Sequence, residues 1–205
     1  ASRRFDQLLE GIRMMVCAED LGLQPDCVSE VLDEYRILTT EIQTMPKEAE
    51  MEFSRLSANP YRSMAVISTH DMAPLRQWWE EFPGRTQRYY ATMMQKEGRA
   101  PQHLPAHLAE EIIARHLYCP SMLCIFSWQD WMSISSTLRR KDPWQERINA
   151  PFDCYNQWKY RMHLTIEKLS EAGQFNEKLK TMITRSKRGL MVLSEESVPL
   201  GRAEG

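Results

Sequence analysis

Two short segments of the chain contain the residues best suited to catalysis. Glu19 and Asp20 directly follow one apolar run, and His70 and Asp71 follow another. Carboxyl groups together with a histidine can donate and accept protons and can offset a developing positive charge, which is the chemistry that cleavage of a glycosidic bond requires. Because each segment comes directly after a strand-like run, the sequence predicts a catalytic site at the edge of a sheet.

These segments must be positioned by the elements around them, and four apolar runs predict short buried strands. The runs are 14–18, 37–42, 64–68 and 122–126. Apolar residues with helical spacing predict helices between and after the runs. The expected helices are 5–12, 28–32, 75–79, 104–116, 158–169 and 179–183, with Gly173 between the last two. The alternation of strands with helices favours an α/β fold with a parallel sheet.

Polar residues follow the remaining two runs as well. Gln43 comes after the second run, and Trp128-Gln129-Asp130 comes after the fourth. Because the carboxyl ends of parallel strands lie at the same edge of a sheet, we expect these side chains to converge although they are far apart in the sequence. The charged, irregular stretch 46–60 is typical of a long loop, and we expect it on this functional side of the sheet.

Each candidate also has a structural interpretation, which the sequence leaves open. Asp71 precedes Pro74, a residue suited to the first turn of a helix, so Asp71 could be the N-cap of that helix. Glu19 and Asp20 could be solvated loop acids before a turn. His70 could be a hydrogen-bonded structural histidine. The joint placement of these residues after strands favours the catalytic interpretation.

Other residues that could bind a metal or a sugar have incomplete motifs. His103 and His107 show the i, i+4 spacing of a helical zinc pair, but Pro105 lies between them and no glutamate follows the first histidine, so we expect no metal site. Trp78 and Trp79 cannot share one helix face. At least one of them is therefore expected to pack in the core, while the other could stack on a sugar ring.

Composition narrows the function classes. The 26 Lys and Arg residues against 28 Asp and Glu residues leave a net charge of -2, which does not provide the basic field that binding to nucleic acid or an anionic membrane needs. The basic run 139–141 is expected to be a solvated surface patch. No apolar stretch reaches the roughly 20 residues that cross a bilayer, and no signal peptide is evident, so we expect a cytoplasmic protein.

Cysteine usage gives a separate expectation. The chain contains five cysteines, an odd number, and none of them forms a Cys-x-x-Cys pair. This pattern argues against a disulfide framework and against a structural zinc site. We therefore expect buried free thiols.

Several segments, taken in order, resemble a known family. They are Ala18-Glu19-Asp20-Leu21-Gly22, Ser68-Thr69-His70-Asp71 with Leu75-Arg76-Gln77-Trp78-Trp79, and Arg147-Ile148-Asn149-Ala150-Pro151 with Trp158-Lys159-Tyr160-Arg161-Met162. Their order and spacing resemble glycoside hydrolase family 77, the 4-α-glucanotransferases or amylomaltases. One departure is Phe152, which stands where many members carry glycine.

The resemblance implies a retaining (β/α)₈ barrel enzyme that transfers segments of α-1,4-glucans between maltooligosaccharides without a cofactor. It implies that Glu19 is the acid/base and that Asp71 stabilises the transition state. It also implies that His70 hydrogen-bonds the sugar at the cleaved bond. Further residues expected to contact substrate are Asp20, Gln43, Asn149 and Pro151. Asp20 is the alternative acid/base if the alignment is shifted by one residue.

The family's nucleophile is an aspartate in an Arg-x-Asp segment at the end of the preceding barrel strand. We expect no such segment before Glu19, because residues 1–12 resemble the helix that leads into the fifth strand. Residues 1–188 are then expected to form the C-terminal half of the barrel, with about four parallel strands, flanking helices and terminal helices, and 189–205 a disordered tail. The isolated chain is expected to be inactive. The alternatives are a non-catalytic carbohydrate-binding remnant and an α-amylase-like hydrolase.

Overall fold

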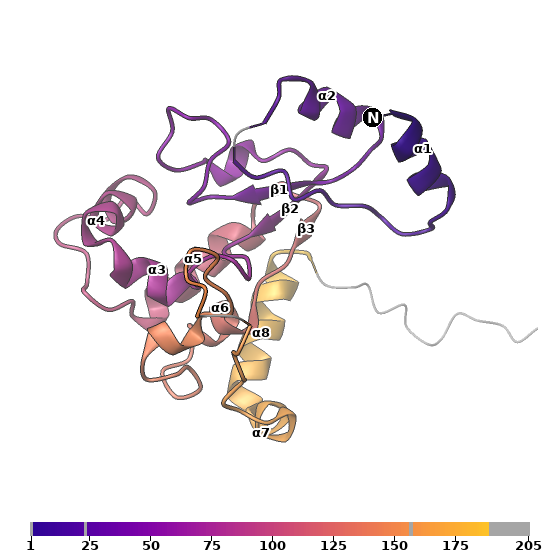
Figure 1. Ribbon diagram of the computed structural model, residues 1–205. Coiled ribbons are helices and arrows are strands. Elements are labelled where there is room, and N and C mark those ends of the chain that lie inside the picture. Colours follow the sequence, from indigo (N-terminus) through magenta and orange to yellow (C-terminus); the bar gives the residue numbers. More distant parts are fainter. Residues whose placement is uncertain (1, 23, 156–157, 189–205) are drawn as a thin grey trace, which may run out of the picture.

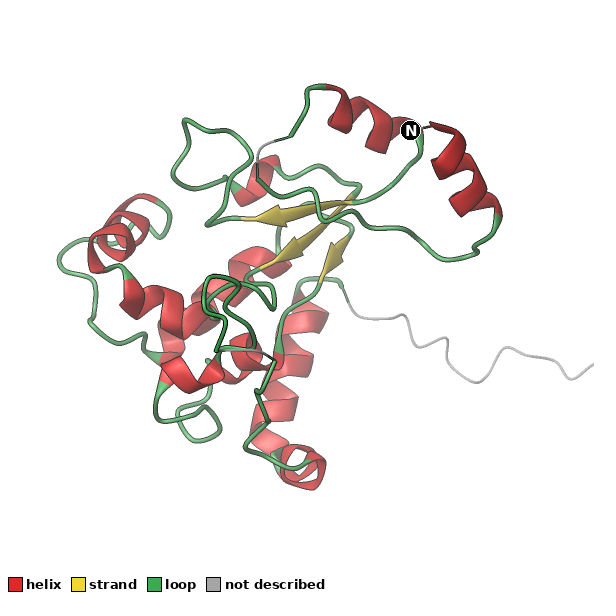
Figure 2. Cartoon of the chain, in the orientation of Figure 1, coloured by secondary structure: helices red, strands yellow, loops and turns green. Residues whose placement is uncertain are grey.

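A small parallel sheet forms the centre of the computed structural model, which describes residues 2–22, 24–155 and 158–188 (Figures 1 and 2). Its strands are β1 (Thr39–Ile42), β2 (Ser63–Val66) and β3 (Leu123–Cys124), in the spatial order β1-β2-β3. Both strand pairs run parallel. The α/β fold with a parallel sheet that the sequence predicts is therefore confirmed.

The central strand, β2, is buried at three of its four positions. It pairs with β1 along its whole length, so Thr39 lies opposite Ser63 and Ile42 opposite Val66. Burial on both faces is typical of parallel sheets covered by helices, and it explains why the strand appears in the sequence as a continuous apolar run.

The first predicted strand is shorter than expected. The run 14–18 forms a single parallel bridge, between Cys17 and Leu38, so the described sheet has three strands and one bridge in place of four strands. Met14 and Met15 at the start of this run are largely exposed, and the run has a pairing partner on one side only. The bridge still runs parallel, so Glu19 emerges on the same side of the sheet as the residues after β1 and β2.

The helices surround this sheet. They are α1 (Ser2–Glu10), α2 (Cys27–Glu34), α3 (Leu75–Glu81), α4 (Pro83–Thr92), α5 (Ala106–Leu117), α6 (Trp128–Met132), α7 (Ile166–Glu171) and α8 (Gly173–Arg185), with the 3₁₀ turns η1 (Leu56–Ala58) and η2 (Pro143–Glu146). In the view of Figure 1, α1 and α2 lie above the strands and α7 and α8 below them. Five predicted helices are confirmed, and the predicted loop 46–60 contains only η1.

The hydrophobic core lies between the sheet and the helices α3, α4 and α5. Trp79, Tyr89 and Ile113 are among its most deeply buried side chains. Trp78 is also buried, at 8% exposure, while Trp79 is 1% exposed and its indole N–H donates to the carbonyl of Pro101. Both tryptophans therefore pack in the core, and neither stacks on a sugar from the surface.

One predicted helix is wrong over most of its length. The apolar spacing from Trp158 to Leu169 predicted a single helix, but the helix α7 begins only at Ile166. Trp158 has a φ of 48°, a value incompatible with a right-handed helix. Thr165 instead starts α7, because its side chain accepts a hydrogen bond from the N–H of Lys168 as an N-cap.

Two further expectations concern the ends of the chain. The expectation that no Arg-x-Asp segment precedes Glu19 is wrong, because Arg4-Phe5-Asp6 is such a triplet. It lies inside α1, and Asp6 accepts a hydrogen bond from the Tyr35 hydroxyl, so this aspartate is not at a strand end. The predicted disordered tail, 189–205, lies outside the described residues. Among the described helices, none combines the length and the apolar character needed to cross a membrane.

A buried carboxylate, Asp130, connects the end of β2 to the start of α3. Asp130 is fully buried in α6, where its Oδ2 accepts a hydrogen bond from the Ser68 hydroxyl at 2.6 Å and its Oδ1 accepts one from the N–H of Leu75 at 2.8 Å. Burial raises the pKa of Asp130, and these hydrogen bonds oppose that increase. Asp130 was expected among the polar residues of the site, but it acts inside the fold as a structural link.

A buried ion pair holds η2 against α3. Arg76 donates to Glu146 Oε1 at 2.6 Å and to the carbonyl of Arg140 at 2.7 Å. Glu146 Oε2 is buried without a partner among the described residues, and burial raises the pKa of Glu146 to about 7 although Arg76 opposes the change. This pair fixes the point from which segment 147–151 begins.

We expect Asp130→Ala to lower the free energy of unfolding by about 2 to 4 kcal/mol, because a buried hydroxyl and a helix N–H lose their acceptor. Urea unfolding of the chain measures the effect. Asp142→Ala is the matched control: Asp142 accepts from the N–H of Trp144 at the exposed start of η2, and its loss should cost about 1 kcal/mol or less. Equal losses for the two variants would contradict the role given to Asp130.

The Glu146 carboxyl predicts a pH dependence of stability. Between pH 4.5 and 7 the folded chain keeps a proton on Glu146 that the unfolded chain releases, so this group's contribution to stability is lost as the pH rises through that window. Wild type should therefore lose up to about 3 kcal/mol relative to Glu146→Gln over this range. Urea unfolding at several pH values measures the difference. Glu48→Gln, at an exposed site, should follow wild type, and a constant offset between wild type and Glu146→Gln would refute the assignment.

Candidate active site

His70 and Asp71 lie in the segment that leads from β2 to α3, at the carboxyl edge of the sheet. Both side chains are partly exposed, and His70 Nε2 is 3.4 Å from Asp71 Oδ2. The N–H of Asp71 donates to the Thr69 hydroxyl oxygen at 3.3 Å. Because Asp130 binds the residues at both ends of this segment, its path between the two elements is constrained.

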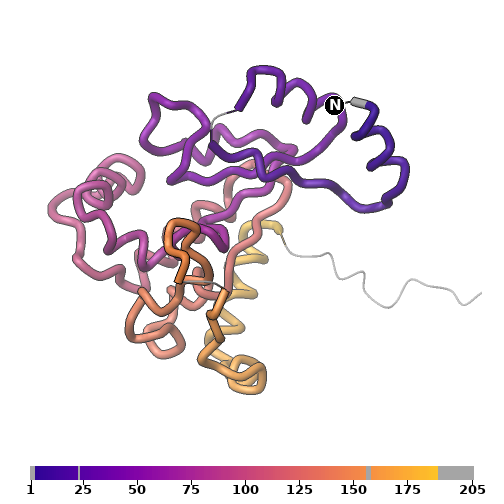
Figure 3. Tube along the Cα trace, in the orientation of Figure 1, coloured from indigo at the N-terminus to yellow at the C-terminus, as the bar shows by residue number. Residues whose placement is uncertain are grey.

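A second segment, far along the chain, completes the surroundings of Asp71. The Asn149 side-chain amide donates to Asp71 Oδ1 at 2.6 Å, and the Asn149 backbone N–H donates to the carbonyl of His70 at 3.0 Å. Figure 3 shows the segment near residue 150 passing beside the one that follows β2. One oxygen of Asp71 is thus held by an amide, and the other faces the imidazole.

Two site residues were not predicted individually. The Trp158 ring lies 4.9 Å from the His70 ring, at an interplanar angle of 34°, and Trp158 is 58% exposed. Arg147 donates to the carbonyl of Asn149 at 2.9 Å and to that of Asp71 at 3.4 Å. Both residues belong to the segments that carry the family resemblance, and this was the signal that could have identified them.

The two neighbouring carboxylates Glu19 and Asp20 have different environments. Asp20 is buried, and it accepts hydrogen bonds from the backbone N–H of Thr40 and from Lys47 Nζ, each at 2.7 Å. Glu19 is exposed. The structure therefore gives Asp20 an internal role next to β1, and it leaves Glu19 as the member of the pair that faces solvent. The geometry favours Glu19 over Asp20 as the acid/base.

Lys47 and Gln43 organise the loop that follows β1. Lys47 Nζ bridges Asp20 and Glu41, the second at 2.6 Å. Gln43 is buried, with its Oε1 accepting from the Tyr89 hydroxyl at 2.7 Å and its Nε2 donating to the carbonyl of Ser54 at 3.2 Å. Gln43 and Asp20 thus use their polar atoms inside the protein, while the expectation that they contact substrate stays a prediction.

The predicted residues therefore form two groups along one edge. His70, Asp71 and Asn149 contact one another, and Pro151 is exposed on the same segment as Asn149. Glu19 belongs to the second group. The paired segments that precede Glu19 and Asp71 are separated by β1, which places them two strand spacings, about 10 Å, apart across the sheet.

The structural interpretation of Asp71 as a helix cap is wrong. Pro74 is the N-cap residue of α3, and it makes no side-chain capping hydrogen bond. The N–H of Leu75 is instead satisfied by Asp130. The Asp71 carboxylate therefore does not cap α3.

The remaining candidates are accounted for by structural contacts. His103 lies 3.1 Å from Glu80, and no group of three potential metal ligands occurs among the described residues. The expectation that 139–141 is a solvated patch is wrong for two of its three residues: Arg139 and Arg140 are half-buried, and Arg139 donates to the carbonyl of Leu104 at 2.9 Å.

The cysteines differ in part from the expectation. Those within the described residues are free thiols, as expected. Cys17, Cys27 and Cys154 are exposed, however, and only Cys119 is fully buried, with Cys124 half-buried. The prediction of burial is therefore wrong for three of the five.

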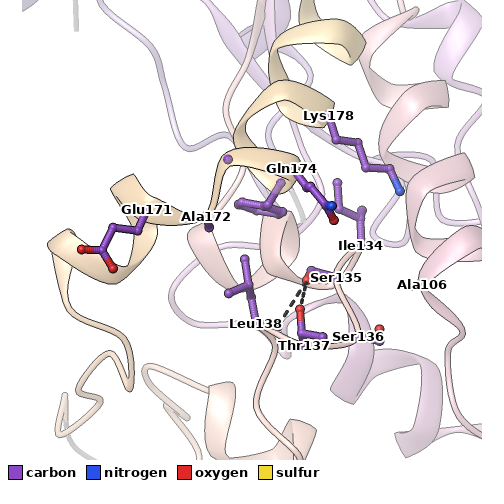
Figure 4. Close-up of a pocket in the computed structure, with 12 residues that line it drawn as sticks. Ala106, Ile134, Ser135, Ser136, Thr137, Leu138, Glu171, Ala172, Gln174 and Lys178 are labelled. Carbon is purple, nitrogen blue, oxygen red and sulfur yellow. Dashed lines mark hydrogen bonds between the residues drawn. The ribbon is translucent and has the colours of Figure 1, made fainter.

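A cavity of about 530 Å³ lies away from this edge, between residues 134–138 and the start of α8 (Figure 4). Ser135 and Thr137 are hydrogen-bonded to each other at 3.2 Å on one side of it, and Gln174 and Lys178 project from α8. None of the seven residues predicted for the site lines this cavity. The candidate active site is therefore the polar edge of the sheet.

Comparisons of the sequence find relatives of one family. A sequence model of the family described as 4-alpha-glucanotransferase matches residues 2–165. The chain is 34% identical over 188 residues to 4-alpha-glucanotransferase DPE2 of Oryza sativa subsp. japonica, which covers 92% of this chain and 20% of the rice protein. It is 29% identical over 181 residues to a 4-alpha-glucanotransferase of Chlamydia muridarum (strain MoPn / Nigg), covering 87% of this chain and 34% of that protein.

Comparisons of the structure find the same fold. An amylomaltase from Streptococcus agalactiae, in complex with acarbose, superimposes with a TM-score of 0.67 and 20% identity, over 90% of this chain and 34% of that one. An amylomaltase from Corynebacterium glutamicum gives a TM-score of 0.63 and 17% identity, over 85% and 29%. The chain thus spans a fifth to about a third of the length of these proteins. The family match over most of its residues shows that this chain belongs to the 4-α-glucanotransferase family, glycoside hydrolase family 77.

Proposed function

We propose that the protein containing this chain is a 4-α-glucanotransferase, which moves segments of α-1,4-glucans between maltooligosaccharides in the cytoplasm with retention of configuration. The observation that carries the proposal is the fixed group of Asp71, His70 and Asn149 at the carboxyl edge of a parallel sheet, in a chain of this family. A partly exposed carboxylate that is held by an amide and caps no helix is suited to stabilising positive charge.

In this proposal the carboxylates act in two retaining steps. Glu19 protonates the leaving glycosidic oxygen while a nucleophilic aspartate forms a glycosyl-enzyme intermediate, and Glu19 then takes a proton from the 4-hydroxyl of the acceptor glucan. Asp71 offsets the positive charge that develops on the sugar ring in both steps. His70 hydrogen-bonds the same sugar, and its imidazole is positioned by Trp158.

The proposed substrate contacts follow from which side chains are exposed and which have their polar atoms bound inside the protein. Trp158 presents a largely exposed indole beside His70, which suits stacking against a sugar face. Asn149 and Pro151 shape the same wall of the site. Asp20 and Gln43 support the opposite wall from inside, because their polar atoms are bound to Thr40, Lys47, Tyr89 and Ser54.

We further propose that residues 1–188 supply strands five to eight of a (β/α)₈ barrel. The parallel strands with helices between them support this assignment, as does the likeness to two amylomaltases of which the chain covers about a third. A closed barrel of this kind has eight strands, so the remaining strands and the nucleophilic aspartate would come from outside the described sheet. The chain by itself is then expected to have no transferase activity.

Two alternative functions can be distinguished from transfer by their products. A hydrolase of the α-amylase kind would release sugars to water without lengthening any acceptor, and a carbohydrate-binding remnant would bind maltooligosaccharides without turnover. The transferases among its relatives favour transfer. Product analysis after incubation of the complete protein with maltotriose separates the three, since only transfer yields chains longer than maltotriose.

We expect Glu19→Gln in the complete protein to lower the rate of maltotriose disproportionation by about 10³-fold or more, because the amide cannot exchange the proton that both steps need. Asp71→Asn should have a loss of similar size. Glu30→Gln, at an exposed position in α2, is the matched control and should keep the wild-type rate. Near-normal transfer by Glu19→Gln would reject its role as acid/base.

Asn149→Ala tests whether the amide orients Asp71. The variant should lose about 10- to 100-fold in kcat while KM changes less, since the carboxylate would shift at the point of charge development. Asn149→Asp should be worse, because it places a second negative charge beside Asp71. Steady-state kinetics with maltotriose measure both, with Gln102→Ala as the exposed amide control. If Asn149→Ala and Gln102→Ala have the same kcat, Asn149 does not position Asp71.

A further inference from the structure

Two free thiols lie against each other where α5 ends and β3 begins. The Sγ atoms of Cys119 and Cys124 are 3.9 Å apart. Cys119 is 5% exposed, and Cys124, the last residue of β3, is half-buried. This pair could not be predicted from the sequence, because the spacing of five residues matches no common thiol motif.

The fold holds the turn between these cysteines in place. The N–H of Met122 donates to the carbonyl of Tyr61 at 2.8 Å. The Ser121 hydroxyl contacts the Asn59 side-chain amide at 3.0 Å and the Ser63 hydroxyl at 2.8 Å. The approach of the two sulfur atoms is therefore set by contacts to the start of β2.

A guanidinium group lies beside one of the sulfur atoms. Arg188 Nη2 is 3.8 Å from Cys119 Sγ and donates to the Cys119 carbonyl, while Arg188 Nε donates to the carbonyl of Leu117. The Cys124 thiol in turn donates to the carbonyl of His116 at 3.2 Å. A positive charge next to Cys119 stabilises its thiolate, which is the reactive form of cysteine.

The titration of the pair follows from these contacts. When the Cys124 S–H turns from the His116 carbonyl to the Cys119 sulfur, its hydrogen bond lowers the pKa of Cys119 to about 6, with further lowering from Ser121 and Arg188 and opposition from burial. The Cys119 thiolate in turn raises the pKa of Cys124. Cys119 is thus the nucleophile, and Cys124 is the thiol that can respond to it.

A cavity adjoins the pair on the side of Cys124, and Cys119 is not among the residues that line it. This cavity, of about 490 Å³, is lined by Cys124, Ser121 and Arg188, together with Trp131 and Lys187 from other elements. It is large enough for a peroxide molecule, and its cationic side chains lie next to the thiol pair.

We propose that Cys119 and Cys124 form a redox-active dithiol, which hydrogen peroxide converts into an intramolecular disulfide. The Cys119 thiolate attacks one peroxide oxygen, the O–O bond breaks, and hydroxide leaves and is protonated to water. The Cys124 sulfur then attacks the Cys119 sulfenic acid, the S–S bond forms and the S–O bond breaks, and a second water carries away the Cys124 proton. Two thiols lose two hydrogens, and one peroxide becomes two waters.

The required movement is small. A disulfide has an S–S length of about 2.05 Å, so the two sulfur atoms must approach by about 2 Å. Because the turn between the two cysteines is held by the contacts of Ser121 and Met122, the two side chains must supply this shift. The other cysteines, Cys17, Cys27 and Cys154, have no thiol contact in the described structure, so they can be replaced without removing a contact of the pair.

The experiment uses the 205-residue chain with Cys17→Ser, Cys27→Ser and Cys154→Ser, substitutions at exposed sites that leave only the pair. Titration with hydrogen peroxide, followed by alkylation and mass spectrometry of the intact chain and its peptides, should show a monomer that has lost two hydrogens and carries a Cys119–Cys124 link. A reductant should restore two alkylatable thiols. The proposal is overturned if both thiols remain alkylatable, if only intermolecular links form, or if Cys119 proceeds to sulfinic acid while Cys124 stays free.

A second measurement tests the part played by Arg188. The rate of Cys119 alkylation should rise with pH with a midpoint near pH 6 and reach a plateau at higher pH, as expected for a thiol of that pKa. Arg188→Gln should move the midpoint to higher pH, whereas Lys187→Gln, a neighbour on the same cavity, should not. Equal midpoints in all three chains would remove Arg188 from the proposal, and a wild-type midpoint near the ordinary thiol value of about 8.5 would refute the reactive pair.

Discussion

The candidate site depends on one buried carboxylate, Asp130. Its two oxygens bind the Ser68 hydroxyl and the N–H of Leu75, so they hold both ends of the segment that carries His70 and Asp71. A buried carboxylate is tolerated here because both of its oxygens are hydrogen-bonded. Loss of either donor would leave an unpaired buried oxygen, which costs free energy of folding. The short segment between β2 and α3 therefore has little freedom, and the side chains that it presents keep their place at the edge of the sheet.

The two walls of the site are built by different kinds of contact. Around Asp71 the partners are an amide from Asn149 and the His70 ring, and the carboxylate stays partly exposed to solvent. Around Asp20 the partner is the cation Lys47, and the carboxylate is buried. A buried ion pair fixes the position of its two residues more than it stabilises the fold, because the free energy of desolvating the charges offsets most of their attraction. The adjacent carboxylates thus have separate environments, with Asp20 bound inside the fold and Glu19 exposed to solvent.

The buried pair of Arg76 and Glu146 connects the site to the helical layer. It holds η2 on α3, and Asn149 follows η2 by three residues. The thiol pair lies elsewhere, at the opposite end of β2 from the catalytic edge, since the turn between Cys119 and Cys124 is bound to residues that precede and begin that strand. The two places share β2 as their common support.

The amino-acid sequence alone determined the local features. Continuous apolar runs predicted the strands β1, β2 and β3, and the apolar residues of α3 and α5 gave their helices, because strand and helix periodicity depend on near neighbours. The position of Glu19 and Asp71 after strands was likewise readable. The sequence could not show that Asp130 accepts from the first N–H of α3, or that Asp20 and Gln43 face inward. It also could not show that Trp158 lies outside a helix and contacts the His70 ring. Each of these depends on a partner far away in the chain, and only the tertiary structure decides which polar atoms are satisfied inside and which remain free for a substrate.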